Sequence, residues 1–430
     1  MNKKVLLILP RNERGFWGKV TNGKAGFVRL SLSTVAALTP PDWEVTIHDA
    51  RAHPVDYNCD VGLVGITAFS AETPSAYEIA AKFRAKDVPV VMGGVHATAM
   101  PDEALEHVDA VVIGEAEDVW ETLLRDLENG QLKRKYKADT LCDMQNMKIP
   151  RRDLLDRDMY VSVFNTIQAT RGCPFDCEYC AVTQVFGHEF RMRPVSHVID
   201  EIRTFDTRDF MFVDDNICGN PRYAKELFRA LIPLKKIWGA QTSITFARDD
   251  ELLDLYAKAG GRYAFIGFES ISEENLALMN KKWNKANSFA HAIDKIHDAG
   301  VNILGSFILG LDGDDTTAFK RTLDFIMEHN IDAAEFHILT PLPGTRLTKA
   351  LDEAGRITDK DWAKYTACEV VFEPKLMTQT ELANGFYRLW HDTYTIPRIL
   401  KRSFRSLRGI PLRLALNFSY RRKCSRMPRP

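Results

Sequence analysis

The feature that most constrains the fold is a repeated alternation of short apolar runs with segments of helical period. In residues 1–130, apolar runs lie at 5–10, 61–67, 88–94 and 110–114, and a run of alternating polarity lies at 43–49. Strands that are apolar on both faces and separated by helices are typical of a parallel sheet covered on both sides. We therefore expect an α/β fold that begins with a doubly wound, Rossmann-like domain. Its ligands would bind at the carboxyl ends of the strands.

A second series of strand–helix units covers residues 161–345. Strand patterns lie at 163–169, 209–213, 239–245, 263–268, 301–309 and 333–339. Helical patterns separate them at 195–204, 223–231, 249–259, 284–299 and 316–328. Six such units predict a partial (β/α)6 barrel, because right-handed crossovers place all the strand carboxyl ends at one mouth. The charged segment 131–160 between the two series is expected to be a linker.

Three cysteines directly follow the first strand of this second series, in the run Cys173-Pro-Phe-Asp-Cys177-Glu-Tyr-Cys180. Iron–sulfur clusters are normally held by four cysteines, so three thiolates would leave one iron open to another ligand. A structural zinc site with His188 as fourth ligand is the alternative, but such sites usually combine two paired motifs. A disulfide framework is not expected, since no feature indicates secretion.

The run from Arg171 to Cys180 resembles the CxxxCxxC motif of radical S-adenosylmethionine (SAM) enzymes. In that family the three cysteines hold a 4Fe-4S cluster, and SAM chelates the remaining iron through its amino and carboxylate groups. Reduction of SAM then gives methionine and a 5′-deoxyadenosyl radical. The resemblance implies that Cys173, Cys177 and Cys180 are the catalytic cluster ligands, and that Tyr179 lies beside the adenine.

Polar residues at the ends of the barrel strands are candidates for binding SAM. Charged residues are rarely buried without partners, and a carboxylate can accept bonds from a ribose diol. Asp214 follows the second strand, Glu269 ends the fourth and Ser306 interrupts the fifth. The segments around Glu269 and Ser306 resemble the ribose and adenine segments of the family. For Asp214 and Asp215 the alternative is capping of the following helix.

Small and polar residues also follow the strands of the first series. They include the runs Gly93-Gly94-Val95-His96-Ala97-Thr98 and Gly114-Glu115-Ala116-Glu117. These runs match the GGxHAT and GExE patterns of the cobalamin-binding domain that precedes the barrel in one class of radical SAM enzymes. The resemblance implies bound cobalamin, with contacts from Thr67, Ser70, Gly93, Gly94, His96, Gly114 and Glu115. The alternative is that the glycines only form tight turns.

Many cobalamin domains carry an Asp-x-His-x-x-Gly motif whose histidine binds cobalt from below. This chain lacks the motif, and His48 and His53 do not have its spacing. The lower axial ligand is therefore left open by the sequence.

Residues 346–430 depart from the strand–helix repeat and are expected to be helical and basic. No acid follows Asp392, and basic residues alternate with apolar ones over 396–430. Such a stretch can lie on an anionic membrane surface, which would suit a lipid or other hydrophobic substrate. The competing interpretation is a basic tail whose apolar side caps the barrel or docks on the first domain.

Composition excludes several classes of protein. The net charge of −1 argues against a nucleic-acid binder, and no apolar run approaches the roughly 20 residues of a membrane span. The N-terminus runs directly into a strand without the pattern of a signal peptide. Eight cysteines and an oxygen-sensitive cluster suit a reducing cytoplasm.

The resemblance covers roughly residues 1–345 and implies a radical SAM enzyme that methylates an unactivated carbon with cobalamin. Its substrate would be a small or lipid-like molecule, and flavodoxin or ferredoxin would supply the electron. Oxidative cyclisation or rearrangement is the alternative within the class, and a non-catalytic cobalamin or redox sensor is the alternative outside it. A methylthiotransferase is disfavoured because residues 1–150 contain only Cys59 and Cys142.

Overall fold

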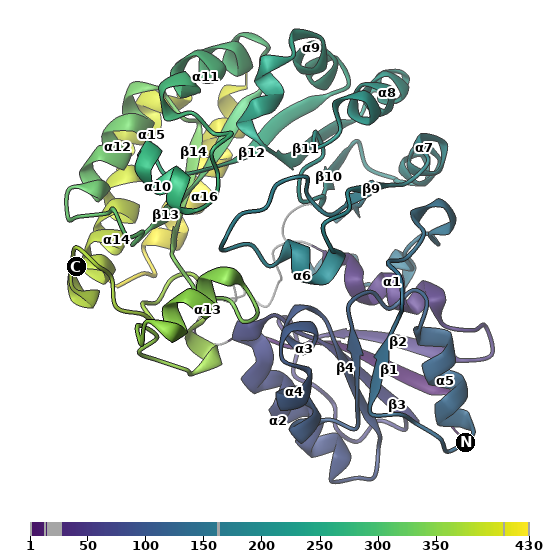
Figure 1. Cartoon of the computed structure of the whole chain (residues 1–430). Helices are drawn as coiled ribbons and strands as arrows, with labels where there is room; N and C mark the ends of the chain where they lie inside the picture. The colour runs from purple at the N-terminus through teal and green to yellow at the C-terminus, as the bar shows by residue number, and fades with distance from the viewer. Residues whose placement is uncertain (1, 13, 15–27, 161–163, 407–408, 429–430) are drawn as a thin grey trace.

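The computed structural model describes residues 2–12, 14, 28–160, 164–406 and 409–428. It contains two parallel six-stranded sheets, each with helices packed against it, and a helical C-terminal region (Figure 1). The predicted start of a strand at residue 163 lies outside the described residues. So do residues 407, 408, 429 and 430 of the basic tail.

The first sheet has the strand order β2-β1-β3-β4-β5-β6, and all its pairs are parallel. Its strands are β1 (Lys4–Leu9), β2 (Glu44–Asp49), β3 (Leu63–Thr67), β4 (Val90–Gly93), β5 (Ala110–Ile113) and β6 (Lys135–Lys137). Five of these were predicted. The sixth, β6, lies in the segment that we expected to be a linker, because three residues with alternating burial give too short a pattern to detect.

Helices cover both faces of this sheet, which explains its continuously apolar strands. They are α1 (Leu30–Leu38), α2 (Thr73–Arg84), α3 (Val95–Ala99), α4 (Pro101–His107) and α5 (Trp120–Glu128). Leu6 and Ile8 of β1 belong to a core with α2 and α4. Leu7 and Leu9 belong to a second core with α1 and α5.

The second sheet has the order β14-β13-β12-β11-β10-β7 and is also parallel throughout, as expected for a partial (β/α)6 barrel. Its strands are β7 (Thr166–Ile167), β10 (Asp209–Phe212), β11 (Ile237–Thr242), β12 (Gly261–Glu269), β13 (Asn302–Leu309) and β14 (Ala333–Ile338). The predicted strand at 163–169 is shorter than expected. After β7 the chain continues into β8 (Thr170–Arg171), which pairs antiparallel with β9 (Arg191–Met192).

Most helices of this barrel form an arc on one face of the sheet, and the other face lines the barrel interior, whereas the helix after the cysteine loop lies toward the first domain (Figure 1). They are α6 (Val182–Phe186), α7 (Val195–Arg203), α8 (Pro221–Leu231), α9 (Asp250–Lys258), α10 (Glu273–Leu278), α11 (Phe289–Asp298) and α12 (Ala318–Glu328). Phe268 packs on the outer helices through Phe289 and Phe325, and Phe336 packs on Trp390. Alternate residues of β12, β13 and β14 therefore face inward.

The C-terminal region covers the free edge of β14. Its helices are α13 (Arg346–Glu353), α14 (Gln379–Thr393), α15 (Ile396–Ser403) and α16 (Ile410–Cys424). The Tyr394 hydroxyl bonds both the N–H and the carbonyl of Ala334, at 3.0 and 2.6 Å, and so occupies backbone groups of the edge strand. Among the described residues, no helix has both the length and the hydropathy needed to cross a membrane.

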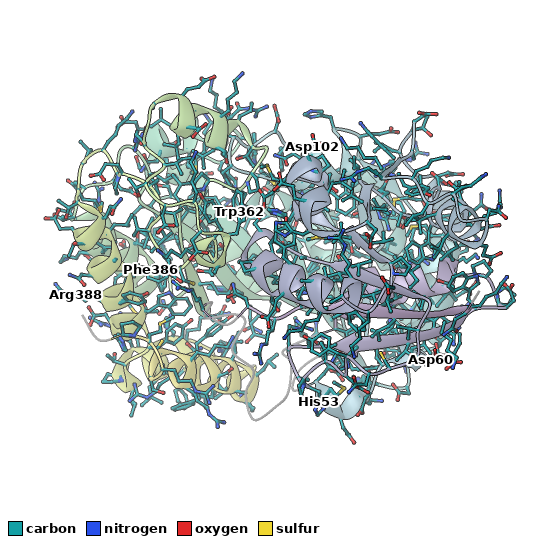
Figure 2. The ribbon with its side chains drawn as sticks, turned by 90° about the horizontal axis from the view of Figure 1, so that it is seen from below. His53, Asp60, Asp102, Trp362, Phe386 and Arg388 are labelled. Carbon is teal, nitrogen blue, oxygen red and sulfur yellow. The ribbon has the colours of Figure 1, made fainter. Side chains whose placement is uncertain are left out.

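The same region also contacts the first domain. Trp362 lies at the boundary between the two parts of the molecule (Figure 2). Its indole N–H donates to Glu103 at 2.8 Å, and its ring meets that of His96 edge-on at 5.2 Å. The C-terminal region thus fixes the first domain against the barrel.

Candidate active site

The three motif cysteines lie on the loop between β8 and α6, at the mouth of the barrel. The turn that precedes them needs a glycine, because Gly172 has a φ of +83° and an added Cβ would lie 2.4 Å from the carbonyl oxygen of Glu189. Cys173, Cys177 and Cys180 are all partly accessible. The loop therefore presents three sulfur donors from one short stretch of chain.

Neighbouring elements hold this loop from the outside. Arg346, on α13, binds the Asp176 carboxylate at 2.7 Å and the Glu178 carboxylate at 2.8 Å. Asn280 donates to the Asp176 carbonyl at 2.7 Å, and Phe175 stacks on Trp283 with ring centroids 4.1 Å apart. The loop is thereby positioned by segments far away in the sequence.

The donor chemistry fits an iron–sulfur cluster. Burial raises the pKa of the Cys177 thiol to about 11 and that of Cys180 to about 12. Without metal these thiols keep their protons at neutral pH, so a bound cation must displace them. Three soft thiolates suit iron in a cluster better than a hard, oxygen-seeking cation.

Glu269 and Tyr179, the residues predicted to contact SAM, lie next to each other beside this loop. Glu269 ends β12 with a φ of +63°, and its carboxylate accepts from Lys281 at 2.7 Å. The pKa of Tyr179 is raised, first by burial and then by the nearby Glu269. A Cβ on Gly267 would lie 2.1 Å from the Glu269 carboxylate, so only glycine allows this arrangement. Ser306 is buried on β13, opposite Gly267 of β12.

Asp214 is a predicted contact of SAM, and in the structure its carboxylate bonds groups of the protein. Its carboxylate accepts from the backbone N–H of Ala169 at 3.0 Å and from the Thr170 hydroxyl at 2.7 Å. Asp214 therefore holds the chain that leads into the cysteine loop. Asp214 and Asp215 do not cap the next helix, α8. Its cap is Asn220, whose side chain accepts a hydrogen bond from the N–H of Tyr223.

Asp215 lies closer to the cysteines. Burial raises its pKa to about 6, and the backbone N–H of Gly172 partly opposes that shift. Its Oδ2 is buried without a hydrogen-bond partner in the part of the chain that the structure describes.

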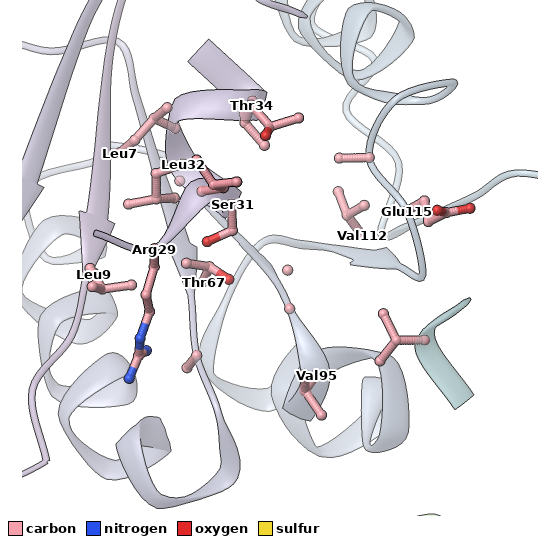
Figure 3. Close-up of a pocket in the computed structure, with 18 of the residues that line it drawn as sticks. Leu7, Leu9, Arg29, Ser31, Leu32, Thr34, Thr67, Val95, Val112 and Glu115 are labelled. Atoms are coloured by element: carbon pink, nitrogen blue, oxygen red, sulfur yellow. The ribbon is translucent and has the colours of Figure 1, made fainter. Parts of the chain in front are cut away.

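A cavity of about 350 Å³ lies at the carboxyl ends of the first sheet (Figure 3). Of the residues predicted to bind cobalamin, Thr67, Gly93, Gly94, Gly114 and Glu115 line it. A Cβ on Gly65 would lie 2.8 Å from Leu7, and one on Gly94 would lie 2.6 Å from the Thr67 hydroxyl. These two glycines therefore serve close packing within the protein, whereas a Cβ on Gly114 would meet only the Val185 carbonyl oxygen, at 4.0 Å, so the cavity is open at that glycine. The mostly apolar lining with a few polar groups such as Thr67 and Glu115 fits a cofactor such as cobalamin.

The cavity continues to the barrel domain. Residues from the second part of the chain that line it are Gln168, Arg171, Val185, Phe186 and Val213. Two of these flank the cysteine loop, since Arg171 precedes Cys173 and Phe186 ends α6. A cofactor in this cavity would therefore face the barrel mouth.

Ser70 and His96 lie outside the set of residues that line this cavity. The His96 ring is fully buried, with Nδ1 3.2 Å from the Ser70 hydroxyl and Nε2 3.3 Å from the Tyr77 hydroxyl. Glu103 also lies 3.4 Å from Nε2. The structure thus uses His96 to join α2, α3 and α4 and to support Trp362.

A buried ion-pair group joins the two domains. Arg171 binds Glu115 at 2.6 Å and Glu117 at 2.5 Å, and Arg191 binds Glu115 at 2.9 Å. Burial alone would raise the pKa of Glu115, but Arg191 and Arg171 outweigh it and lower that pKa. Glu115, Glu117 and Cys142 have the geometry of a metal site, yet the two guanidinium groups already neutralise them.

Comparison with known proteins agrees with this arrangement. Residues 27–124 match the B12 binding domain, and residues 167–326 match the Radical SAM superfamily. The chain is 33% identical to bacteriochlorophyllide d C-12(1)-methyltransferase of Chlorobaculum tepidum, over 95% of this chain and 90% of that protein. It is 31% identical to bacteriochlorophyllide d C-8(2)-methyltransferase of the same organism, over 87% of each chain.

The fold is similar to that of the radical SAM methyltransferase TsrM from Kitasatospora setae, solved with cobalamin and a 4Fe-4S cluster. The TM-score is 0.70 at 15% identity, over 99% of this chain and 100% of that one. The two sheets and the cysteine loop already define an enzyme that combines a B12-binding domain with a radical SAM barrel. The chain belongs to the family of cobalamin-dependent radical SAM methyltransferases. Its cofactors are a 4Fe-4S cluster, SAM and cobalamin.

Several residues of this site were not predicted. Lys281, Trp283 and Arg346 reach the site from loops and helices distant in sequence, and nothing in their local pattern marks them. Arg171 stands directly before the cysteine motif, but its partners Glu115 and Glu117 lie in another domain. Only the tertiary contact identifies that pairing.

Proposed function

We propose that this protein transfers a methyl group to an unactivated carbon of a predominantly apolar small molecule, with a tetrapyrrole as the first candidate substrate. The observation that carries the proposal is the cavity of the first sheet, which reaches residues on both sides of the cysteine loop. This juxtaposition would bring a methyl donor and a radical source to the same space.

The residues of the chain have distinct tasks in this proposal. Cys173, Cys177 and Cys180 would hold the cluster, while Glu269 and Tyr179 would orient SAM. The residues that line the first cavity would hold cobalamin. When bound, these groups supply an adenosyl radical and a transferable methyl group, and the protein binds, orients and excludes water.

Two observations support an apolar, tetrapyrrole-like substrate. Both relatives described above are named for methylation of bacteriochlorophyllide d. The inner face of the barrel carries Phe265, Leu304 and Ile308, which remain partly accessible while the outer face is buried. Such a surface favours a substrate with a large apolar area.

The experiment is anaerobic reconstitution with iron, sulfide and cobalamin, followed by incubation with SAM, a reductant and bacteriochlorophyllide d. We expect 5′-deoxyadenosine to form and the pigment to gain the mass of one methylene group. A product with lost hydrogens and no added carbon would instead support oxidative cyclisation. Loaded enzyme that forms no 5′-deoxyadenosine would contradict both and favour a sensor.

We also infer that a small electron carrier such as flavodoxin or ferredoxin supplies the electron, because reductive cleavage of SAM consumes one. The reducing cytoplasm is the proposed location, since it would protect the cluster from oxygen.

A peripheral membrane contact is a separate proposal, carried by the C-terminal helices. We define the C-terminal apolar ridge as the exposed residues Ile396, Leu400, Phe404, Leu412 and Phe418. The first three are spaced four residues apart along α15 and its end, so they lie on one side. Lys401, Arg421 and Arg422 are exposed nearby, and no acid follows Asp392. An anionic lipid surface would match both the apolar and the basic character of this ridge.

We expect the reconstituted protein to bind vesicles of phosphatidylglycerol and phosphatidylcholine at low salt, measured by co-sedimentation. Replacing Leu400 and Phe404 by serine should weaken this binding by about tenfold, since it exposes less apolar area to the bilayer. The matched control replaces by serine Leu278 and Leu376, which lie elsewhere and are at least as exposed as Leu400. Equal binding by both double variants, or none by the wild type, would refute the contact.

A further inference from the structure

We infer that Glu335, His337 and Tyr420 form a substrate-recognition subsite on the inner face of the barrel, which binds a hydroxyl or N–H group of the substrate. The inference rests on the proposed function and specifies which polar group an otherwise apolar substrate must carry. It depends on residues outside the cluster, SAM and cobalamin sites described above.

The direction of these side chains follows from the pleat of β14. Phe336 packs on Trp390 of α14, with ring centroids 5.1 Å apart, so it faces outward. Glu335 and His337 flank it in sequence and must therefore point to the opposite face, toward the barrel interior. Glu335 Oε2 and His337 Nε2 are 3.9 Å apart.

Helix α16 supplies the third member of this group. The Tyr420 hydroxyl donates to Oε1 of Glu335. The Tyr420 ring packs on Tyr394 at 5.3 Å, and the ammonium of Lys423 lies 5.0 Å from its centroid. Since Tyr394 itself bonds the edge of β14, Tyr420 is held firmly against the carboxyl group. One oxygen of Glu335 is thus fixed by the protein, and the other lies toward His337.

The electrostatic state of the group favours a neutral ligand. Burial raises the pKa of Glu335 to about 7 and lowers that of His337. A neutral imidazole offers one donor and one acceptor, and a carboxyl near its pKa can also do either. A substrate carboxylate would be repelled by ionised Glu335, whereas a hydroxyl or an N–H can bond to both residues.

The neighbours of this group belong to the inner face of the barrel that we propose to contact the substrate. Register pairs Ser306 with Glu335 and Ile308 with His337, so the apolar inner residues of β13 are its neighbours. The charge of Glu269, at the mouth, acts across the interior and raises the pKa of His337, against the lowering by burial. The buried Tyr263 hydroxyl has no hydrogen-bond partner within the described ranges. A polar group on an apolar ligand would find complementary partners in Glu335 and His337, beside the apolar Leu304 and Ile308.

The test compares two chlorins that differ only in one side-chain hydroxyl. Binding is measured anaerobically by pigment fluorescence with the enzyme carrying cluster, cobalamin and SAM, but without reductant. We expect the wild type to bind the hydroxylated chlorin about tenfold more tightly, as for one additional buried hydrogen bond. Glu335→Gln and His337→Phe should each reduce this preference severalfold while binding of the other chlorin stays unchanged.

Two variants serve as controls, His291→Asn on the exposed side of α11 and Ser419→Ala beside Tyr420. Both should keep the preference. Iron content and thermal unfolding must match the wild type before a variant is interpreted. A preference that persists in both subsite variants would overturn the inference.

The failure of the proposed function gives a different result. If neither chlorin binds to the wild type, a tetrapyrrole substrate is contradicted, and the comparison is repeated with a triterpenol and its deoxy counterpart. Discrimination within that pair that depends on Glu335 and His337 would support the subsite. If the two members of each pair bind equally, or if none of the four ligands binds, the inference is overturned.

Discussion

At the residue scale, single side chains act through the groups that surround them. The cysteines of the loop have raised pKa values because they are largely, though not fully, withdrawn from solvent, so they need a metal to become thiolates. Glu269 takes a left-handed backbone conformation, which is uncommon outside glycine and costs energy. Its carboxylate is held by Lys281 in a position where it faces the cysteine loop. Such strain is typical of a residue positioned for a ligand.

Replacing Cys177 by serine should abolish the cluster, because a hydroxyl is a poor ligand for iron–sulfur and two thiolates leave two irons open. Iron content and visible absorbance after anaerobic reconstitution should fall to near background, and 5′-deoxyadenosine should not form. Cys59→Ser in the first domain is the control and should behave as the wild type. A fully loaded Cys177→Ser protein would contradict the assignment.

At the element scale, helix α16 shows how a basic segment can belong to the core. Arg413 is 1% exposed and donates to the Asn302 side chain at 3.0 Å and the Ser403 carbonyl at 2.9 Å. Asp332, fully buried before β14, binds Arg405 at 2.8 Å. These contacts tie α16 and the segment before it to the barrel, so part of the positive charge of the tail is structural.

Replacing Arg413 by alanine should lower the free energy of unfolding by about 3 kcal/mol, because it leaves the buried Asn302 amide oxygen and Ser403 carbonyl without their donor. Urea denaturation followed by circular dichroism measures this change. The exposed Arg422→Ala on the same helix should stay within about 0.5 kcal/mol of the wild type. Equal stability of the two variants would show that the buried contacts contribute nothing.

At the scale of the whole molecule, the contacts that join the two domains include an ion-pair group and a tryptophan. The ion-pair group around Glu115 joins the cavity of the first sheet to the start of the cysteine loop. Trp362 joins the C-terminal region to α3 and α4. Together they fix the separation between the B12-binding cavity and the barrel mouth, on which transfer of a group between them would depend.

Glu115→Gln should loosen this junction, since Arg191 and Arg171 lose the charge that both share. We expect about 2 kcal/mol less stability and faster hydrogen exchange in the loop around Arg171. Glu121→Gln, exposed on α5, is the matched control. Unchanged exchange around Arg171 in Glu115→Gln would indicate that the ion pairs do not hold the domains together.

Much of the architecture was readable from local patterns. Apolar runs identified five strands of the first sheet, and strand–helix alternation identified six of the second. Asp249 caps α9 by accepting from the N–H of Leu252, and Gly260 follows the end of the helix with a φ of +99°. The short β6 and the division of the strand before the cysteines escaped prediction, because two or three residues carry no periodic signal.

The sequence by itself determined the order of the domains, the cysteine loop and the glycine turns of the first cavity, because these depend on residues close together in the chain. Only the tertiary structure decided that Asp214 supports the backbone, that His96 faces the core, and that Arg171 pairs with Glu115. It alone also placed Tyr420 against Glu335. Such assignments depend on which distant side chains meet, and a carboxylate or an imidazole looks the same in sequence whatever its partner is.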